Sequence, residues 1–291
     1  MKPQHVYFES NGAVLSGLLY QPERAGPWPA AVVAGSWTSV KEQMPATYAQ
    51  ALASLGYAAL CFDFRGWGAS SGEPRYLEDP QRKIADIHAA LGFMKARADI
   101  DTDNIALLGI CASAGYMTHV AAQSDVPHAL CLIAPWLHDR GIVLETYGGE
   151  AGVEALMSAA RNAEASDGVV IEAASASNPG ALMYQVPYYT EPGRGLIQQY
   201  DNLFDVRSWA PWLSFDGIAA AEGITIPSCI VHSKAAAIPH GVTRFVSRLP
   251  RFAQVAWLED VSQFDFYDRP DVVAEATRMV VAHLDAHRRT S

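Results

Sequence analysis

The sequence lacks several features that would assign it to a common functional class. Only 18% of its 291 residues are charged, and 21 basic residues stand against 31 acidic ones, giving a net charge of −10. This balance argues against a nucleic acid or an anionic membrane as partner, because both carry negative charge. No apolar run approaches the length of a membrane span, and the N-terminal MKPQHVYFES lacks the apolar core of a signal peptide. We therefore expect a cytoplasmic protein.

Sequence motifs for metals, disulfides and dinucleotides are also missing. The four cysteines, at positions 61, 111, 131 and 229, each lie in or just after an apolar run, which is typical of buried thiols. The glycine-rich FDFRGWGASSG at 62–72 lacks the G-K-[ST] ending and the strand-to-helix context of a phosphate loop. We expect no disulfide, no metal and no organic cofactor, and we interpret 62–72 as a structural corner.

The sequence does contain an alternation of strand-like and helix-like segments. Asn11-Gly12 predicts a hairpin between strands at 5–10 and 13–20. Short apolar runs predict more strands, and apolar residues at helical spacing predict helices between them. Strands are expected at 30–34, 57–62, 105–110, 129–134, 228–231 and 253–258, and helices at 42–55, 80–95, 112–122, 239–249 and 270–287. This order predicts one α/β domain with a mostly parallel sheet.

The alternation stops between residues 136 and 217. This stretch holds a helix-like segment near 150–161, an Ala/Ser-rich passage and many aromatic residues. Because a structureless loop of this length is improbable, we predict that 136–217 is a cap inserted into a core made of 1–135 and 218–291. The alternative for the aromatic side chains is that they only pack the cap onto the core. The candidates for substrate binding are Tyr184, Tyr188, Tyr189, Trp209 and Trp212.

The segment 104–117, NIALLGICASAGYM, carries the strongest functional signal. A buried apolar strand is followed at once by an alanine-rich helix, so the residue between them adopts strained backbone angles and needs small neighbours two positions away. Gly109 and Ser113 are those neighbours of Cys111. The pattern is typical of a nucleophile elbow, G-x-S-x-G, with Cys111 as nucleophile and the Ala112 N–H as an oxyanion donor. The N-terminus of the helix would favour the thiolate.

Two other interpretations of this segment stay open. In the first, Cys111 is a small core residue at the end of a buried strand. In the second, Ser113 is the nucleophile, with Cys111 and Gly115 as its small neighbours. The second interpretation places the nucleophile beyond the end of the apolar strand pattern at Ile110.

Four motifs give the chain a family likeness: DFRGWGASSG at 63–72, GICASAGY at 109–116, APWLHD at 134–139 and DFYD at 265–268. Together they resemble the dienelactone-hydrolase-like branch of the α/β-hydrolases, in particular the YcjY-like bacterial proteins and the related fungal polyketide acyltransferases. The resemblance implies an eight-stranded, mostly parallel sheet with helices on both faces and the nucleophile at its carboxyl edge. It also implies a second oxyanion donor after the third strand, at Ser36 or Trp37.

The same resemblance places a general base after the last strand and an orienting acid after the strand at 228–231. The first loop, EDVSQFD, has no histidine, and the second, HSKAA, has no carboxylate. Gln263 and Asp265 are the candidates in the base's loop, although glutamine takes no proton from a thiol. His138, with Asp139 beside it, follows the strand next to the elbow strand and is the other candidate base. Its alternative is a purely structural role.

The sequence therefore predicts an α/β-hydrolase-fold enzyme with a cysteine nucleophile and a degenerate triad. The expected substrate is an ester, thioester or lactone of a small, largely apolar molecule, processed by acyl transfer or hydrolysis in specialised-metabolite biosynthesis. A second acyl acceptor and a homodimer are compatible with the sequence. The alternatives are a cyclase, isomerase or lyase that uses Cys111, His138 or Asp265 for proton transfer, and a catalytically silent binding protein.

Overall fold

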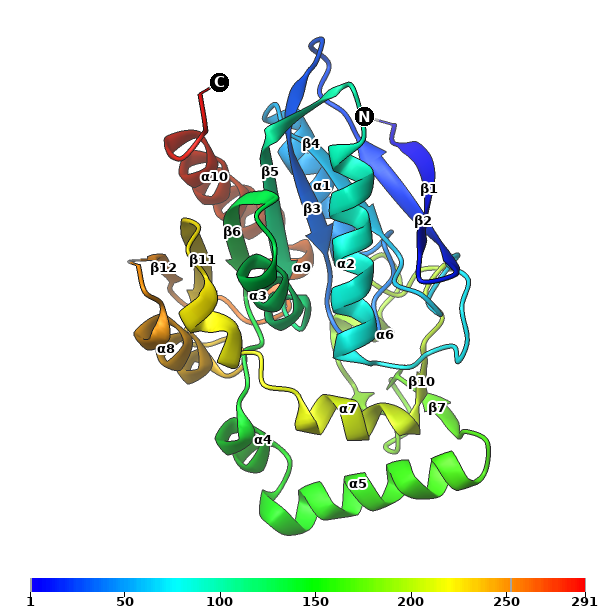
Figure 1. The fold of residues 1–291 in the computed structure, drawn as a ribbon. Coiled ribbons are helices and arrows are strands. Elements are labelled where there is room, and N and C mark those ends of the chain that lie inside the picture. Colours follow the sequence, from blue (N-terminus) through cyan, green and yellow to red (C-terminus); the bar gives the residue numbers. More distant parts are fainter. Residues whose placement is uncertain (1, 252, 291) are drawn as a thin grey trace.

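The computed structural model describes residues 2–251 and 253–290, and an eight-stranded sheet forms its centre (Figure 1). The strands are β1 (Gln4–Ser10), β2 (Ala13–Tyr20), β3 (Trp28–Ala34), β4 (Ala58–Phe62), β5 (Ile100–Ile110), β6 (Pro127–Ile133), β11 (Ser228–Ser233) and β12 (Gln254–Leu258). Their order is β1-β2-β4-β3-β5-β6-β11-β12. The pairs β1/β2 and β2/β4 are antiparallel, and all other neighbours are parallel. This confirms the predicted eight-stranded, mostly parallel sheet. Residues 1, 252 and 291 of the predicted core lie outside the described residues.

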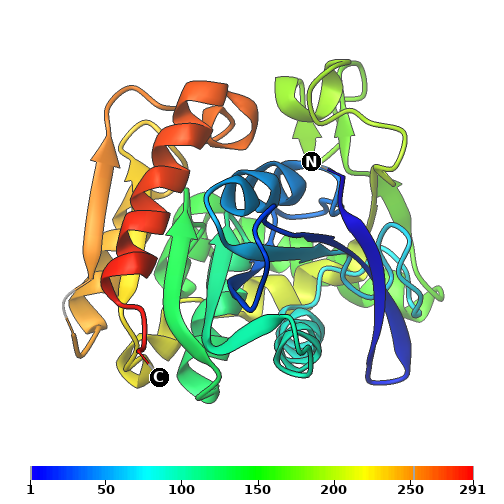
Figure 2. The ribbon, with the colours of Figure 1, turned by 90° about the horizontal axis from the view of Figure 1, so that it is seen from above.

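Helices cover both faces of the sheet, as predicted. Figure 2 shows α1 (Met44–Ser54) and α10 (Pro270–Ala286) on one face and α2 (Pro80–Lys95) on the other, where α2 packs against α3 (Ser113–Gln123). The core also contains α8 (Pro239–Arg248) and the short helix α9 (Asp265–Asp268). Strands β4, β6 and β11 are buried along their whole length, which explains why their sequences are continuous apolar runs rather than alternating ones.

Local chemistry explains where helices begin. The Asp79 carboxylate accepts hydrogen bonds from Gln81 N at 2.9 Å and Arg82 N at 3.3 Å, and Pro80 occupies the first turn, so α2 begins where the sequence predicts. The predicted helix at 42–55 begins later, at Met44. The backbone before Met44 is not helical, because it is bound to the turn after β4: Lys41 N donates to the Asp63 carboxylate at 2.7 Å.

The glycine-rich turn at 62–72 is a structural corner, as predicted. The buried Asp63 carboxylate accepts from Lys41 Nζ at 2.6 Å and from Ala69 N at 2.9 Å. Gly68 has φ +49°, and a Cβ there would lie 2.4 Å from Asp63 Oδ2. Only glycine therefore allows the turn to wrap this carboxylate.

The chain between β6 and β11 folds beyond the carboxyl ends of the parallel strands (Figure 1). We call residues 136–217 the inserted segment. Sequence periodicity found one of its helices, α5, and missed the shorter ones. Its helices are α4 (Arg140–Thr146), α5 (Gly149–Ala165), α6 (Pro187–Thr190) and α7 (Trp209–Ser214), and its strands are β7 (Val170–Glu172), β8 (Ala174–Ser175), β9 (Met183–Tyr184) and β10 (Leu203–Asp205).

Candidate active site

The turn between β5 and α3 has the geometry that the elbow pattern predicts. Cys111 has φ +55°, in the left-handed region that costs free energy for a residue other than glycine. Hydrogen bonds hold this turn on both sides: Cys111 N donates to Ile133 O at 3.1 Å, and Trp136 N donates to Cys111 O at 2.9 Å. A Cβ at Gly109 would lie 2.8 Å from Ala114 Cα, so glycine lets the strand and helix meet this closely.

Ser113 does not occupy a nucleophile's position. Its side chain is fully buried at the start of α3, and its Oγ is a buried atom without a hydrogen-bond partner in the structure. Cys111, by contrast, lines a pocket. The alternative register, with Ser113 as nucleophile, is therefore contradicted by the geometry of the turn.

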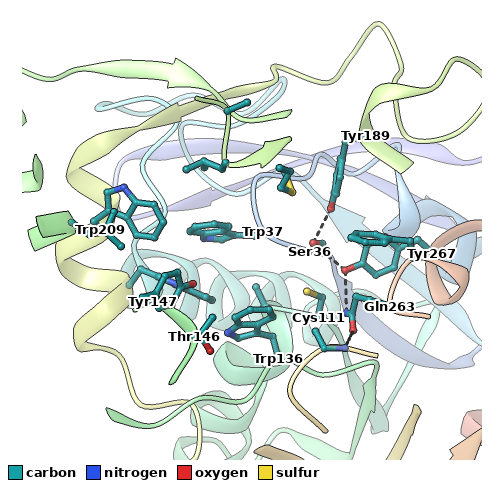
Figure 3. Close-up of a pocket in the computed structure, with 18 of the residues that line it drawn as sticks. Ser36, Trp37, Cys111, Trp136, Thr146, Tyr147, Tyr189, Trp209, Gln263 and Tyr267 are labelled. Atoms are coloured by element: carbon teal, nitrogen blue, oxygen red, sulfur yellow. Dashed lines mark hydrogen bonds between the residues drawn. The ribbon is translucent and has the colours of Figure 1, made fainter. Parts of the chain in front are cut away.

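The pocket over Cys111 is an apolar cavity of ≈570 Å³ (Figure 3). The core and the inserted segment both contribute to its walls. None of its lining residues, all of them within the described chain, is Asp, Glu, Lys, Arg or His. The lining residues are Ser36, Trp37, Cys111, Ala112, Trp136, Thr146, Tyr147, Leu156, Gly180, Ala181, Leu182, Met183, Tyr189, Trp209, Trp212, Ala237, Gln263, Phe264 and Tyr267. Such a cavity accommodates an uncharged molecule of modest size.

Two opposing effects act on the Cys111 thiol. Burial raises its pKa, and it is opposed by hydrogen bonds from the Tyr267 and Ser36 hydroxyls and from the backbone N–H groups of Ala112 and Trp37. The net shift is upward. The Ala112 N–H at the start of α3 lowers the pKa of the thiol, in the direction expected of a helix N-terminus, but desolvation is the larger cause. Trp37 acts on the thiol through its backbone N–H, whereas Ser36 acts on it through its hydroxyl.

A network of hydroxyl and amide groups lies beside the sulfur (Figure 3). Tyr189 OH donates to Ser36 Oγ at 2.9 Å, and Tyr267 OH lies 3.4 Å from the same oxygen. Gln263 Nε2 donates to Tyr267 OH at 3.2 Å. Gln263 is thus present in the site, as the sequence analysis expected for the residue in the base's loop, and it contacts the site through Tyr267.

His138 is buried in aromatic packing and is not among the pocket-lining residues. Its Nδ1 accepts from the indole N–H of Trp136 at 2.9 Å, and its Nε2 lies 3.2 Å from Trp212 O. Its ring packs edge-on against Trp212, with centroids 4.6 Å apart. Burial lowers its pKa to about 4. The structure therefore does not bring His138 to Cys111 but uses it to hold Trp136, which does line the pocket.

The two acidic candidates also have structural partners outside the pocket. Asp139 caps α4 by accepting from Ile142 N at 3.0 Å, and it pairs with Arg244 at 2.9 Å. Asp265 accepts from the backbone N and the hydroxyl of Ser262, both at 2.7 Å. Neither carboxylate lines the cavity. The structure therefore leaves both of them away from the sulfur.

The five aromatic candidates of the inserted segment divide into two groups. Tyr184 is 42% exposed and does not line the pocket. Tyr188 is buried but outside the lining, and its hydroxyl accepts from Met44 N at 3.1 Å. The other three line the cavity: Tyr189, Trp209 and Trp212. Trp37 stacks on Trp212 with centroids 5.0 Å apart.

Sequence reasoning missed several pocket residues, above all Tyr267. Tyr267 lies in α9 (Asp265–Asp268), just after the loop that was searched for a histidine. The DFYD motif marked this position, but nothing in residue type or spacing indicated that the tyrosine faces Cys111. Trp136 and Tyr147 were missed as well, because their place depends on the packing of α4 and α7.

The described residues contain neither a metal-binding cluster nor a helix that could cross a bilayer. Within the described chain, no three His, Cys, Asp or Glu side chains cluster closely enough to hold a metal ion. None of the helices described is both long and apolar enough to cross a bilayer. All four cysteines are buried and unpaired.

Known proteins share both sequence and fold with this chain. YcjY, an uncharacterised protein of Escherichia coli (strain K12), is 36% identical over 112 residues, which cover 38% of this chain and 37% of that protein. The acyltransferase drtE of Aspergillus calidoustus is 33% identical over 130 residues, which cover 44% of this chain and 41% of that protein. The thiohydrolase aneE of Aspergillus aculeatus is 36% identical over 103 residues, covering 35% and 32%. The match thus spans less than half the length of each of these three relatives.

Solved structures confirm the fold over nearly the whole chain. The hypothetical protein PA2218 of Pseudomonas aeruginosa superposes with a TM-score of 0.86 at 22% identity, covering 98% of this chain and 94% of that one. The α/β-hydrolase GrgF of Penicillium sp. sh18 has a TM-score of 0.81 at 19% identity and covers 99% of both chains. Residues 11–176, more than half of the sequence, match the family model of X-Pro dipeptidyl-peptidase (S15 family). The chain therefore belongs to this S15 family, whose members here have the α/β-hydrolase fold seen in the solved structures.

Proposed function

We propose that the protein is an acyl-transferring enzyme in which Cys111 attacks the carbonyl carbon of a neutral, largely apolar ester, thioester or lactone. One observation carries the proposal: Cys111 occupies the strained turn between β5 and α3 and lines an apolar cavity, and the N–H groups of Ala112 and Trp37 lower the pKa of its thiol. Donors fixed in this way stabilise the oxyanion that forms on the carbonyl oxygen.

The absence of charged side chains from the described lining supports a neutral substrate. A free carboxylate or ammonium bound in this cavity would lose its hydration without gaining a partner of opposite charge. A peptide with a free N-terminal ammonium, which the family name suggests as a substrate, therefore fits poorly. The stacked rings of Trp37 and Trp212 favour an alkyl, alkenyl or aromatic acyl group.

The lack of a histidine in the lining favours transfer over hydrolysis. Water, a much weaker acid than a thiol, attacks an acyl-cysteine slowly when no imidazole or carboxylate base removes its proton. An acyl-Cys111 intermediate would then persist until an acceptor with a better nucleophile enters the cavity. The names of the fungal relatives, a thiohydrolase and an acyltransferase, support this class of chemistry.

The proposed reaction has two balanced halves. In the first, the sulfur–carbon bond forms, the bond to the leaving group breaks, and the thiol proton leaves with that group. In the second, an acceptor alcohol, amine or thiol takes the acyl group and returns its proton to Cys111. We assign the inserted segment, residues 136–217, the role of a cap over this chemistry, and we place the reaction in specialised-metabolite biosynthesis.

The test is direct detection of the acyl-enzyme. The protein is incubated with the S-hexanoyl thioester of N-acetylcysteamine, and its intact mass is followed over time. We expect an increase of one hexanoyl group on Cys111, absent in Cys111→Ala, which an added alkyl thiol discharges faster than water does. No adduct on the native protein, or an equal adduct on Cys111→Ala, would overturn the proposal. Substrate turnover without any adduct would favour the lyase or isomerase alternative.

A further inference from the structure

We propose that Tyr267 performs the proton transfer that histidine performs in a standard triad, and that Gln263 is the positioning residue that orients it. The inference rests on the acylation of Cys111 proposed above. It concerns a residue of the short helix α9 rather than of the loop where the family places its base. Four side chains carry it: Gln263, Tyr267, Ser36 and Cys111.

The orientation of the Gln263 amide is fixed by two backbone groups. Its Oε1 accepts from Ala237 N at 3.1 Å, and a backbone N–H can only donate. Its Nε2 lies 2.9 Å from Ala134 O, and a carbonyl can only accept. The second Nε2 proton therefore points at the oxygen of Tyr267, 3.2 Å away. The Tyr267 oxygen accepts this bond, so its own proton must be directed elsewhere.

The remaining partners of the Tyr267 hydroxyl are Ser36 and the sulfur. Its distance to Ser36 Oγ is 3.4 Å, at the long end for a hydroxyl pair. Ser36 Oγ already accepts a shorter bond, at 2.9 Å, from Tyr189 OH. Tyr267 and Ser36 both line the same pocket as Cys111 (Figure 3), and both side chains lower the pKa of its thiol. The Tyr267 proton is thus weakly held and adjacent to the atom that must lose a proton in the reaction.

The arrangement differs from ordinary structural use of a buried tyrosine. Tyr48, for example, is also fully buried, and its hydroxyl donates to a backbone carbonyl, that of Phe266, at 2.7 Å. Tyr267, by contrast, makes no hydrogen bond to a backbone carbonyl of the described residues. Its oxygen faces the pocket and interacts with three pocket-lining side chains, those of Gln263, Ser36 and Cys111. A tyrosine needed only for packing would not require this arrangement.

The proton steps balance without a charged base. As the sulfur attacks, the phenol oxygen of Tyr267 takes the thiol proton and gives its own proton to the leaving atom. The tyrosine is neutral before and after, so no phenolate accumulates. Burial beside Cys111 raises the pKa of Tyr267 well above its ordinary value, which agrees with a relay in which the phenol is never left ionised. In the second half the same exchange runs from the acceptor to the sulfur.

Single-turnover acylation of Tyr267→Phe tests the inference. With the S-hexanoyl thioester of N-acetylcysteamine we expect acylation to slow by about 10²–10⁴-fold, the usual value of positioned proton transfer. The loss should be smaller with p-nitrophenyl hexanoate, because p-nitrophenolate leaves without a proton. The solvent isotope effect on native acylation by the thioester should disappear in the variant.

Tyr48→Phe is the matched control, because it removes a buried hydroxyl that contacts neither Ser36 nor Cys111. It should acylate at the native rate. Gln263→Leu should slow acylation as well, and the double variant with Tyr267→Phe should be no slower than Tyr267→Phe alone, because Gln263 acts through the tyrosine. If the fold-loss in acylation rate of the double variant equals the product of the two single-variant losses, Gln263 acts independently of Tyr267.

The outcomes separate this inference from the proposed function. If the native protein forms no acyl-Cys111, the proposed function fails. If the native protein acylates and a folded Tyr267→Phe, checked by near-ultraviolet circular dichroism, acylates equally fast from the thioester, the relay is overturned while the function stands. A uniform loss with both acyl donors would also overturn the relay, since it would indicate a displaced sulfur rather than a missing proton.

Discussion

At the scale of single residues, Cys111 differs from the other cysteines in what surrounds its sulfur. Burial raises the pKa of all four thiols, that of Cys229 to about 12. Only Cys111 both lines the pocket and receives hydrogen bonds from two hydroxyls and two backbone N–H groups. We therefore expect iodoacetamide to alkylate Cys111 before the other three, with a rate that rises with pH through the neutral range. Mass spectrometry of partially labelled protein checks the order; first labelling at Cys61, Cys131 or Cys229 would contradict it.

Ser113 offers a second test at this scale. Its buried Oγ has no hydrogen-bond partner in the structure, and an unsatisfied buried hydroxyl costs about 1–3 kcal/mol. Ser113→Ala should therefore raise the free energy of unfolding, by up to about that amount, and leave acylation of Cys111 unchanged. Urea unfolding and the acylation assay measure the two effects. Loss of acylation with retained stability would restore Ser113 as the nucleophile.

Gln263 lines the pocket from the loop in which the sequence analysis expected the base. Gln263→His should raise hydrolysis of p-nitrophenyl esters by about tenfold or more, because a positioned base is worth about 10²–10⁴-fold and the new imidazole would not be held by an acid partner. Adding Cys111→Ala should abolish the gain, and His138→Ala should leave it, since His138 faces away from the pocket. Brisk native hydrolysis that is lost in His138→Ala would show that the base has been misplaced.

These residues show how far the sequence predicts the site. The turn follows from local constraints: a buried strand, a helix and the small Gly109 define it, so the position of Cys111 in a strained turn could be predicted without a structure. The place of Tyr267 depends on where the chain turns into α9 after a loop, and that is decided by contacts distant in sequence. The same limit applies to His138, whose partners Trp136 and Trp212 close around it only in the folded chain.

At the scale of elements, the strands and long helices were predictable and the inserted segment was only partly so. Helix α2 was predicted with its observed bounds, because its cap, its first-turn proline and its apolar spacing agree. In the inserted segment only α5 has enough turns for a period to be recognised. Helices α4 and α7 have seven and six residues, too few for periodicity, and tertiary packing of aromatic rings stabilises them.

The inserted segment also contains the expected site of first proteolysis. The sequence predicts that the first cut falls within 173–180. The structure narrows this cleavage site, because Ala173 to Ser175 are buried, whereas 176–180 are exposed. Subtilisin should therefore cut first within 176–180. Because Gly180 to Met183 line the pocket, acylation of Cys111 by a hexanoyl group should slow this cut. N-terminal sequencing of the first fragments checks the site, and first cuts inside 30–135 would contradict the domain plan.

At the scale of the whole molecule, buried histidines link stability to pH. His138, His232 and His283 are buried, and burial lowers the pKa of each to about 4. They lie in different parts of the fold: His138 near the start of the inserted segment, His232 at the end of β11, and His283 on α10. An unfolded chain restores each to about 6.5. Between these two values the unfolded state therefore binds more protons than the native state does.

The sign of the effect follows from this difference. Stability from these histidines is fully present above about pH 6.5 and is lost as the pH falls toward 4, with a slope of up to about 1.4 kcal/mol per pH unit for each histidine. Urea unfolding followed by tryptophan fluorescence between pH 5 and 7 should show that the free energy of unfolding changes with pH at a slope approaching that of three protons.

His138→Asn should reduce this slope by about a third, because one titrating group is removed, although it lowers stability at every pH. His5→Asn, which changes an exposed histidine on β1, should leave the slope unchanged. A flat profile between pH 5 and 7, or an unchanged slope in His138→Asn, would mean that these side chains become protonated without unfolding the protein.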